Sequence, residues 1–190
     1  MTIIVATFVF IAWTVYRLIS KENILLEDIF LKPFIWLLPI YIVNGHRDLG
    51  LGKKHLTRHI LIGLAAGLIL SLERLFVNHP TLNFSYLAIV SAFFTAITEE
   101  IFFRGYLLNR WLKNFQKPIF PLVLNGLFFT LTHIPVAIFV YHYSGNGLAV
   151  YLLTNFISGF VDVYLFYLTR SAYTSMANHF VWNLFSGIFR

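Results

Sequence analysis

Long apolar runs separated by short polar segments dominate the pattern of hydrophobic and polar residues along this chain. A helix needs roughly 20 apolar residues to cross a bilayer, within a range of about 17 to 25. The pattern therefore predicts seven membrane-spanning helices, at residues 2–18, 29–45, 59–77, 84–103, 119–141, 147–168 and 174–189. We predict an all-α fold, a polytopic transmembrane helix bundle of about seven spans, with six to eight as the range.

The 190 residues are expected to form one membrane domain, residues 1–190, because no internal repeat, low-complexity tract or soluble domain interrupts the apolar runs. Residues 84–189 hold the unusual polar residues and form the predicted motif-bearing core, whereas residues 1–77 are predicted to supply accessory spans. The first run has no basic leading region and no small-residue cleavage site. A retained span is therefore expected there rather than a removed signal peptide.

Composition supports an integral multi-pass membrane protein. Of the residues, 58% are hydrophobic and 12% are charged, and the mean hydropathy is +0.75. A soluble domain has about a quarter charged residues. The chain has no cysteine, which excludes disulfides, thiolate catalysis and zinc bound by cysteine.

The net charge of +6 does not indicate a nucleic-acid partner, because the basic residues fall in short loops between apolar runs. Loops of this kind are typical of a face that meets anionic lipid. With seven spans, and with Arg104 left out because it belongs to the acidic motif, one side holds eight basic residues: Arg47, Lys53, Lys54, Arg58, Arg110, Lys113, Lys117 and Arg170. The other side holds five: Arg17, Lys21, Lys32, Arg74 and Arg190. The positive-inside rule then places the richer side, and the N-terminus, in the cytoplasm.

Two adjacent carboxylates, Glu99 and Glu100, close the apolar run that starts at Phe84. An ionised carboxylate at bilayer depth is costly, so it needs a partner or a chemical role. Glu100 and Arg104 are four residues apart, which places them on one helix face as a pair. Glu99 lies about 100° further round the helix, so it is predicted to face an interior cavity as a general base. The alternative is that both acids lie at the interface and pair with nearby basic residues.

Two histidines and an asparagine complete the set of polar residues in apolar runs. His133 is followed by Pro135, which bends a helix and exposes backbone carbonyls. His179 and Asn183 are four residues apart, so both can donate hydrogen bonds from one helix face to an oxyanion or a water. Each feature alone has a structural explanation, such as a hydrogen bond between neighbouring helices. Together with the glutamates they supply the parts for cleavage of an amide by water.

Two further features concern packing. The sequence Gly63-Leu-Ala-Ala-Gly67 is a GxxxG motif, and we expect it to pack against another helix of the same chain rather than to form a dimer. Residues 105–118 mix apolar and basic side chains, which indicates an interfacial helix or loop on the cytoplasmic side.

Three motifs in order resemble those of the CPBP intramembrane proteases: Glu99-Glu100-x-x-x-Arg104, Phe129-x-x-x-His133 and His179-x-x-x-Asn183. That family includes the type II CAAX prenyl endopeptidases and the Abi proteins associated with bacteriocin immunity. The run from Leu168 to His179 also resembles the family's approach to its last motif. The resemblance covers roughly residues 95–185, and residues before it match only as generic membrane helices.

The resemblance implies an all-helical membrane protease, in a prokaryotic cytoplasmic membrane, whose site opens toward one membrane face. Its substrate would be a protein or peptide at the membrane, either membrane-associated or lipidated. By motif position, Glu99 activates water with help from His133, and His179 and Asn183 stabilise the oxyanion. Glu100 and Arg104 would support this site.

The resemblance leaves the cofactor open. Glu99, His133 and His179 form a permissible set of three Zn²⁺ ligands with a fourth position for water. A metal-free site would use the same residues as a base and as hydrogen-bond donors.

Other classes of function fit less well. An aspartyl protease needs two buried aspartates, and of the three in the chain only Asp162 lies within a span. A serine protease of the rhomboid kind needs a Gly-x-Ser-Gly sequence, which is absent. A non-catalytic immunity or adaptor protein of the same fold, binding a peptide or protein partner, stays the main alternative. A small transporter, with Asp162, Asn155 and the glutamates in a proton or ion relay, is less favoured, because the two halves show no repeat.

Overall fold

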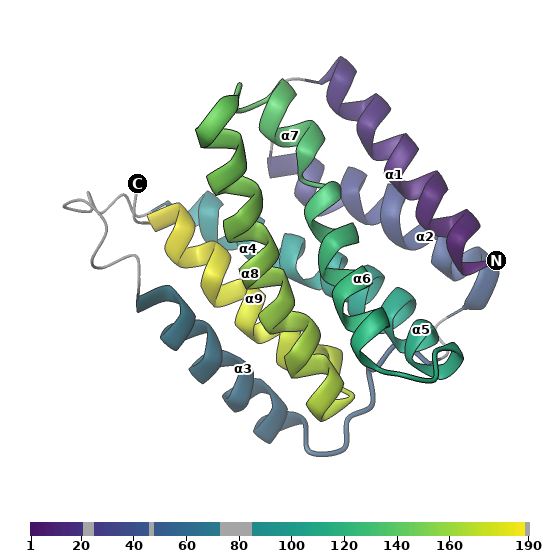
Figure 1. Ribbon diagram of the computed structural model, residues 1–190. Coiled ribbons are helices and arrows are strands. Elements are labelled where there is room, and N and C mark those ends of the chain that lie inside the picture. The colour runs from purple at the N-terminus through teal and green to yellow at the C-terminus, as the bar shows by residue number, and fades with distance from the viewer. Residues whose placement is uncertain (21–24, 46–47, 73–84, 189–190) are drawn as a thin grey trace.

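The structure is a computed structural model that describes residues 1–20, 25–45, 48–72 and 85–188. Within these residues it consists of helices and connecting segments without strands (Figure 1), which confirms the predicted all-α bundle. In chain order the elements are α1 (Thr2–Ile19), η1 (Glu27–Leu31), α2 (Lys32–Asn44), α3 (Leu56–Ser71), α4 (Tyr86–Glu100), η3 (Ile101–Leu108), α5 (Asn109–Asn114), α6 (Ile119–Leu131), α7 (Ile134–Phe139), α8 (Gly145–Thr169) and α9 (Ala172–Ile188).

Each of the seven predicted spans contains a helix. In the described part of the chain, four helical stretches are long and apolar enough to cross a membrane: Thr2–Ile19, Tyr86–Asn114, Ile119–Phe139 and Gly145–Thr169. Helix α3 is apolar but shorter. The end of its predicted span at residue 77, with the basic residue Arg74, lies outside the described residues.

The fourth span is longer than predicted. The chain stays helical from Tyr86 through α4, the π-helical segment η3 and α5 to Asn114, a stretch of 29 residues. The expectation that residues 105–118 form an interfacial helix or loop is therefore wrong for residues 105–108, which are buried with the rest of η3 after Ile101. At 1.5 Å per residue, Glu99 lies roughly 20 Å from the start of this helix and therefore near the middle of its length.

The second span begins earlier than predicted. Its helical residues start at residue 25 rather than 29, and they continue through η1 into α2. Glu27, Asp28 and Lys32, which crowd the start of the predicted span, therefore lie inside the helix, and all three are buried. Because the helix begins earlier, Lys32, a cationic residue of the N-terminal half, lies in the interior.

An aromatic core joins the N-terminal helices to the middle of the bundle. Trp13 of α1 meets the edge of Trp36 of α2, with ring centroids 5.6 Å apart. Trp36 packs edge-on against Phe103 of η3 at 5.4 Å, and Phe103 does the same against Phe129 of α6 at 5.0 Å. Such edge-to-face pairs contribute about 0.5–1.5 kcal/mol each beyond the area that they bury. The series ends at Phe129, beside the polar residues of the interior.

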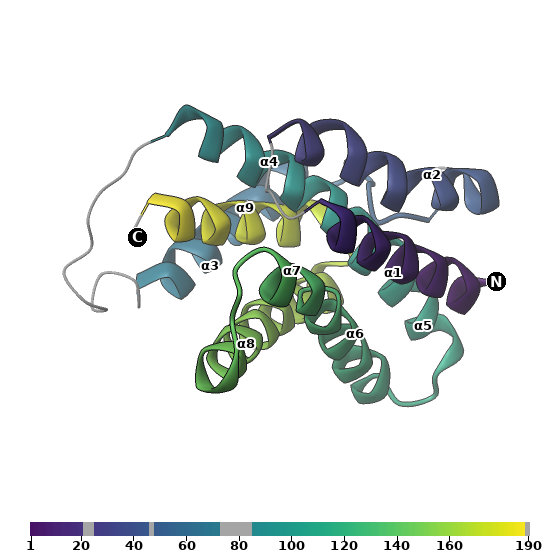
Figure 2. The same ribbon diagram turned by 90° about the horizontal axis from the view of Figure 1, so that it is seen from above.

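Seen from above, the helices fall into two groups (Figure 2). Helices α6, α7 and α8 lie together on one side, and α1, α2, α4 and α9 form a row on the other, with α3 beside α9. Helices α6, α7 and α8 come from the second half of the sequence, whereas the other group includes helices of both halves. The interior between the groups is therefore lined by residues far apart in the chain.

The GxxxG motif packs within the chain, as predicted. Gly63 and Gly67 are buried where α3 meets α9. A Cβ atom on Gly63 would lie 2.1 Å from the carbonyl oxygen of Thr174, and one on Gly67 would lie 2.8 Å from that of Asn178. The missing side chains therefore let the two backbones approach closely.

The loops that were predicted to share one membrane face lie together. A hollow at this end of the bundle is lined by residues 48–52, by Asn109 and Lys113 of α5, and by Arg170 after α8. These residues come from the three basic connecting segments of the predicted topology. That this face is cytoplasmic stays a prediction, which rests on the excess of basic residues.

We expect Gly63→Ala to destabilise the protein by about 1–3 kcal/mol, because the added methyl group forces α3 away from α9. Gly147→Ala is the matched control, since a Cβ on Gly147 of α8 meets no atom within 4 Å. The measurement is thermal unfolding of the purified protein in detergent, followed by circular dichroism. Equal midpoints for the two variants would show that α3 and α9 are not in close contact.

Candidate functional site

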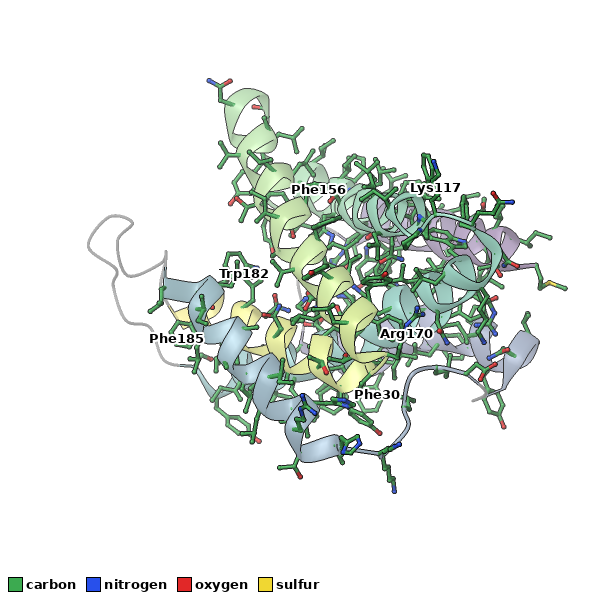
Figure 3. The ribbon with its side chains drawn as sticks, turned by 60° about the horizontal axis from the view of Figure 1, so that its bottom comes forward. Phe30, Lys117, Phe156, Arg170, Trp182 and Phe185 are labelled. Carbon is green, nitrogen blue, oxygen red and sulfur yellow. The ribbon has the colours of Figure 1, made fainter. Side chains whose placement is uncertain are left out.

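A cavity of about 630 Å³ lies in the interior between the two groups of helices. Four of the predicted site residues line it: Glu99, His133, His179 and Asn183. Part of its wall is aromatic and includes Trp182, which Figure 3 shows in the space between α8 and α9. The structure thus brings residues of α4, α9 and the segment between α6 and α7 to one space, as the sequence predicts.

Glu99 occupies the last turn of α4 and is only 3% exposed. One of its carboxylate oxygens, Oε1, forms an ion pair with the ammonium group of Lys32. The other, Oε2, is buried without a hydrogen bond from the described residues and lies 3.7 Å from Nε2 of His179. Glu99 faces the cavity as predicted, but it is not without an ion-pair partner.

Glu100, the next residue along α4, is fully buried. Its Oε1 is 2.9 Å from Nη1 of Arg104, which confirms the predicted pair. The same oxygen accepts a hydrogen bond of 2.8 Å from Nδ1 of His179. Because Nδ1 carries the proton of this bond, Nε2 is the ring nitrogen left to act toward Glu99 and the cavity.

Arg104, from η3, is the central cation of the interior and has no exposed surface. Its Nη2 donates a hydrogen bond of 2.7 Å to the carbonyl oxygen of Gly159 and lies 3.8 Å from the carboxylate of Asp162. Its guanidinium carbon also lies 4.5 Å from the centre of the Phe129 ring. A buried guanidinium with these partners fixes η3 against α8 and α6.

His133 lies at the break between α6 and α7, just before the turn that contains Pro135. Its Nδ1 donates a hydrogen bond of 2.9 Å to the carbonyl oxygen of Phe129, so Nε2 is its second nitrogen for chemistry. The Phe129 ring is 4.6 Å from the His133 ring and 5.8 Å from the His179 ring, measured between centroids. The two histidines therefore flank one phenylalanine at the cavity wall.

Asn183 lies one turn beyond His179 on α9 and is half-buried at the cavity. Asn125, another polar residue in an apolar run, has a structural role instead. Its Nδ2 donates a hydrogen bond of 2.9 Å to the carbonyl oxygen of Phe103 in η3. In a π-helix the backbone bonding is shifted by one residue relative to an α-helix, and a side-chain donor satisfies a carbonyl there.

Three residues belong to the site although the sequence did not assign them to it: Lys32, Asp162 and Asn178. Lys32 pairs with Glu99. Asp162 faces Arg104, and it accepts a hydrogen bond of 2.8 Å from Nδ2 of Asn178. One signal for Lys32 was available, since a charged residue inside an apolar helix is costly unless a buried partner neutralises it.

The residues present do not suit a resident Zn²⁺. Among the described residues, one trio of candidate ligands has its atoms within 4.8 Å of one another, and it consists of Glu100, Asp162 and His179 rather than the expected Glu99, His133 and His179. Arg104 already neutralises both acids of that trio. In the same way, the ammonium group of Lys32 neutralises the carboxylate of Glu99. A divalent cation at either position would be close to a buried positive charge.

Comparison with known protein families shows a match. The family model described as Rce1-like, type II CAAX prenyl endopeptidase Rce1-like, matches residues 81–185. This is more than half of the 190 residues, and it includes every motif residue that the sequence singles out between Glu99 and Asn183. No curated protein and no solved structure matches the chain.

We expect Arg104→Met to destabilise the protein by about 3–5 kcal/mol, because it leaves the carboxylates of Glu100 and Asp162 uncompensated in the interior. Lys113→Met is the matched control. It removes a cation from an ion pair with Asp48 in which both side chains are more than half exposed, and such pairs contribute about 0–1 kcal/mol. Thermal unfolding in detergent measures both. An Arg104→Met variant as stable as the control would contradict the described cluster.

Proposed function

The chain belongs to the Rce1-like family of type II CAAX prenyl endopeptidases, and on that premise we propose that it hydrolyses a peptide bond of a membrane-associated or lipidated protein. In this proposal the nucleophile is a water molecule activated by Glu99. The family supports a membrane protease acting on a protein or peptide substrate.

The observation that carries the proposal is the pairing of Glu99 Oε2 with His179 Nε2. The two atoms are 3.7 Å apart beside the cavity, and the glutamate oxygen makes no hydrogen bond with any described residue. A water at this place can contact both atoms at ordinary hydrogen-bond distance. Catalytic contacts of this kind are commonly long without substrate and tighten in the complex.

In the proposed reaction, Glu99 accepts a proton from the water while the water oxygen attacks the carbonyl carbon of the scissile bond. The negative charge that develops on the carbonyl oxygen is stabilised by donors from α9, Nε2 of protonated His179 and Nδ2 of Asn183. Glu99 then transfers the proton to the leaving amine, so the carboxylate is regenerated and the second proton of the water stays with the acid product. His133 assists by orienting the water through Nε2.

Glu100 and Arg104 act behind this set. The carboxylate of Glu100 fixes the ring of His179 through Nδ1, and Arg104 fixes the carboxylate of Glu100. This division follows the sequence prediction, in which Glu100 supports the site and Glu99 reacts. The proposed reaction uses no metal, because Lys32 and Arg104 already neutralise the carboxylates that would bind one.

A non-catalytic membrane immunity or adaptor protein of the same fold is the alternative. It would use the same cavity to bind a peptide or protein partner without cleaving it. The cleavage experiment separates the two functions, because a pure binder gives no product with any substrate.

We expect Glu99→Gln to lower peptide cleavage by about 10²–10⁴-fold, because glutamine keeps the shape of the side chain but accepts no proton. We expect His179→Ala to lower it by about 10²–10³-fold through loss of a donor to the oxyanion. The assay uses the purified chain in proteoliposomes with a library of fluorogenic peptides that includes prenylated C-terminal peptides.

Gly147→Ala serves as the control in the same assay, since it leaves the packing unchanged and lies outside the cavity lining. If both site variants cleave as fast as this control, the assignment of the site is wrong. If the wild-type protein cleaves no peptide of the library, the adaptor function replaces the protease.

We expect cleavage to survive treatment with a zinc chelator, because Lys32 and Arg104 already neutralise the carboxylates that would bind the ion. The measurement compares initial rates before and after dialysis against the chelator, with the metal content of the protein determined in parallel. A loss of activity that added Zn²⁺ restores would contradict the metal-free proposal.

A further inference from the structure

We propose that Lys32 is a positioning residue of the hydrolytic site, contributed by the N-terminal part of the chain that lies outside the family match. This inference rests on the proposed function of Glu99. It assigns to residues 25–44 a direct part in the site, where the sequence predicts only accessory spans.

The surroundings of Lys32 suit a buried cation. The side chain is 6% exposed at the start of α2, and its ammonium group pairs with Oε1 of Glu99. The same nitrogen lies 5.5 Å from the centres of the Trp13 and Trp36 rings. Two aromatic faces and the carboxylate of Glu99 thus hold a buried cation, and contacts of this kind stabilise it when water is excluded. The buried carboxylates of Asp28 and Glu27 add weaker electrostatic attraction. Lys32 also lines the cavity.

The geometry of the carboxylate shows what this position does. A free glutamate at the end of a helix has several rotamers, and only some of them bring an oxygen to His179. Lys32 binds Oε1, whereas Oε2 is the oxygen that lies 3.7 Å from Nε2 of His179. The ion pair therefore leaves a single oxygen of Glu99 for the water. An ammonium beside a carboxylate also favours its ionised form, which is the form able to accept a proton.

The other charged and titratable groups near Glu99 are already engaged. Glu100 and Arg104 pair with each other. Nδ1 of His179 is bound to Glu100, and that of His133 to the carbonyl oxygen of Phe129. Lys32 is the cation that contacts Glu99 directly among the described residues. Its removal is therefore expected to alter the orientation of Glu99 without disturbing the cluster around Arg104.

The first test compares Lys32→Met, which keeps the length of the side chain but removes the charge, with Lys32→Arg, which keeps the charge. We expect Lys32→Met to lower kcat by about 10–100-fold with KM changed by less than about threefold, because misplacing a catalytic group costs rate rather than binding. We expect Lys32→Arg to recover most of the lost rate. Lys113→Met, at an exposed ion pair, is the matched control.

The second test measures the pair without any activity. In thermal unfolding, Lys32→Met is expected to lower the midpoint because it leaves the carboxylate of Glu99 buried without its cation. Adding Glu99→Gln removes that charge, so the double variant is expected to be more stable than Lys32→Met alone. Should Lys32→Met fail to fold, recovery of folding in the double variant supports the pair and continued failure overturns it.

The outcomes separate this inference from the proposed function. An inactive wild-type protein contradicts the protease function, whereas the unfolding cycle still reports on the pair. An active wild-type protein with an unchanged kcat in Lys32→Met, or with Lys32→Arg no better than Lys32→Met, overturns the positioning role alone.

Discussion

The buried guanidinium of Arg104 is the constraint on which the interior depends. A fully buried cation loses its hydration, and the interaction energy is recovered only if fixed partners surround it. Here the partners come from three other places in the fold: Glu100 of α4, the Gly159 carbonyl and Asp162 of α8, and the Phe129 ring of α6. The positions of these helices relative to η3 are therefore set by one side chain.

The arrangement of side chains at the cavity depends on Arg104 indirectly, through Glu100. Arg104 holds Glu100, and Glu100 holds Nδ1 of His179 through the same carboxylate oxygen. The ring of His179 is thereby oriented with Nε2 toward Glu99. In the proposed mechanism the two neighbouring glutamates, with almost the same burial, differ in role because Glu99 pairs with Lys32 beside the cavity and Glu100 pairs with Arg104. Such a division would keep the electrostatic demands of folding and catalysis on different residues.

Much of this arrangement was predictable from spacing along the chain. The four-residue separations within Glu100–Arg104 and His179–Asn183 fix which side chains share a helix face, and they need no knowledge of the fold. The same reasoning gave the GxxxG contact, because close approach of a helix pair needs small residues at this period. What the sequence could predict was therefore local geometry and the residue types that converge.

The contacts between distant segments were not predictable in this way. Lys32 and Glu99 are joined only because α2 crosses α4, and no local period reports on that crossing. The length of the fourth span was underestimated because a charged residue such as Arg104 is taken as the end of a span when its buried partners on α8 are unknown. From the sequence alone such a charged residue is expected to face solvent, whereas in the fold the buried carboxylates of Glu100 and Asp162 neutralise it.

The contact of α3 with α9 has a consequence for how variation in this protein should be interpreted. Gly67 lies against the backbone of Asn178, the residue next to His179, on the face of α9 that points away from the cavity. A larger residue there would displace this part of α9, and with it His179, which the proposed mechanism uses as a donor to the oxyanion. An alteration in a helix with no polar chemistry of its own can therefore mimic an active-site defect, while every residue in contact with substrate is unchanged.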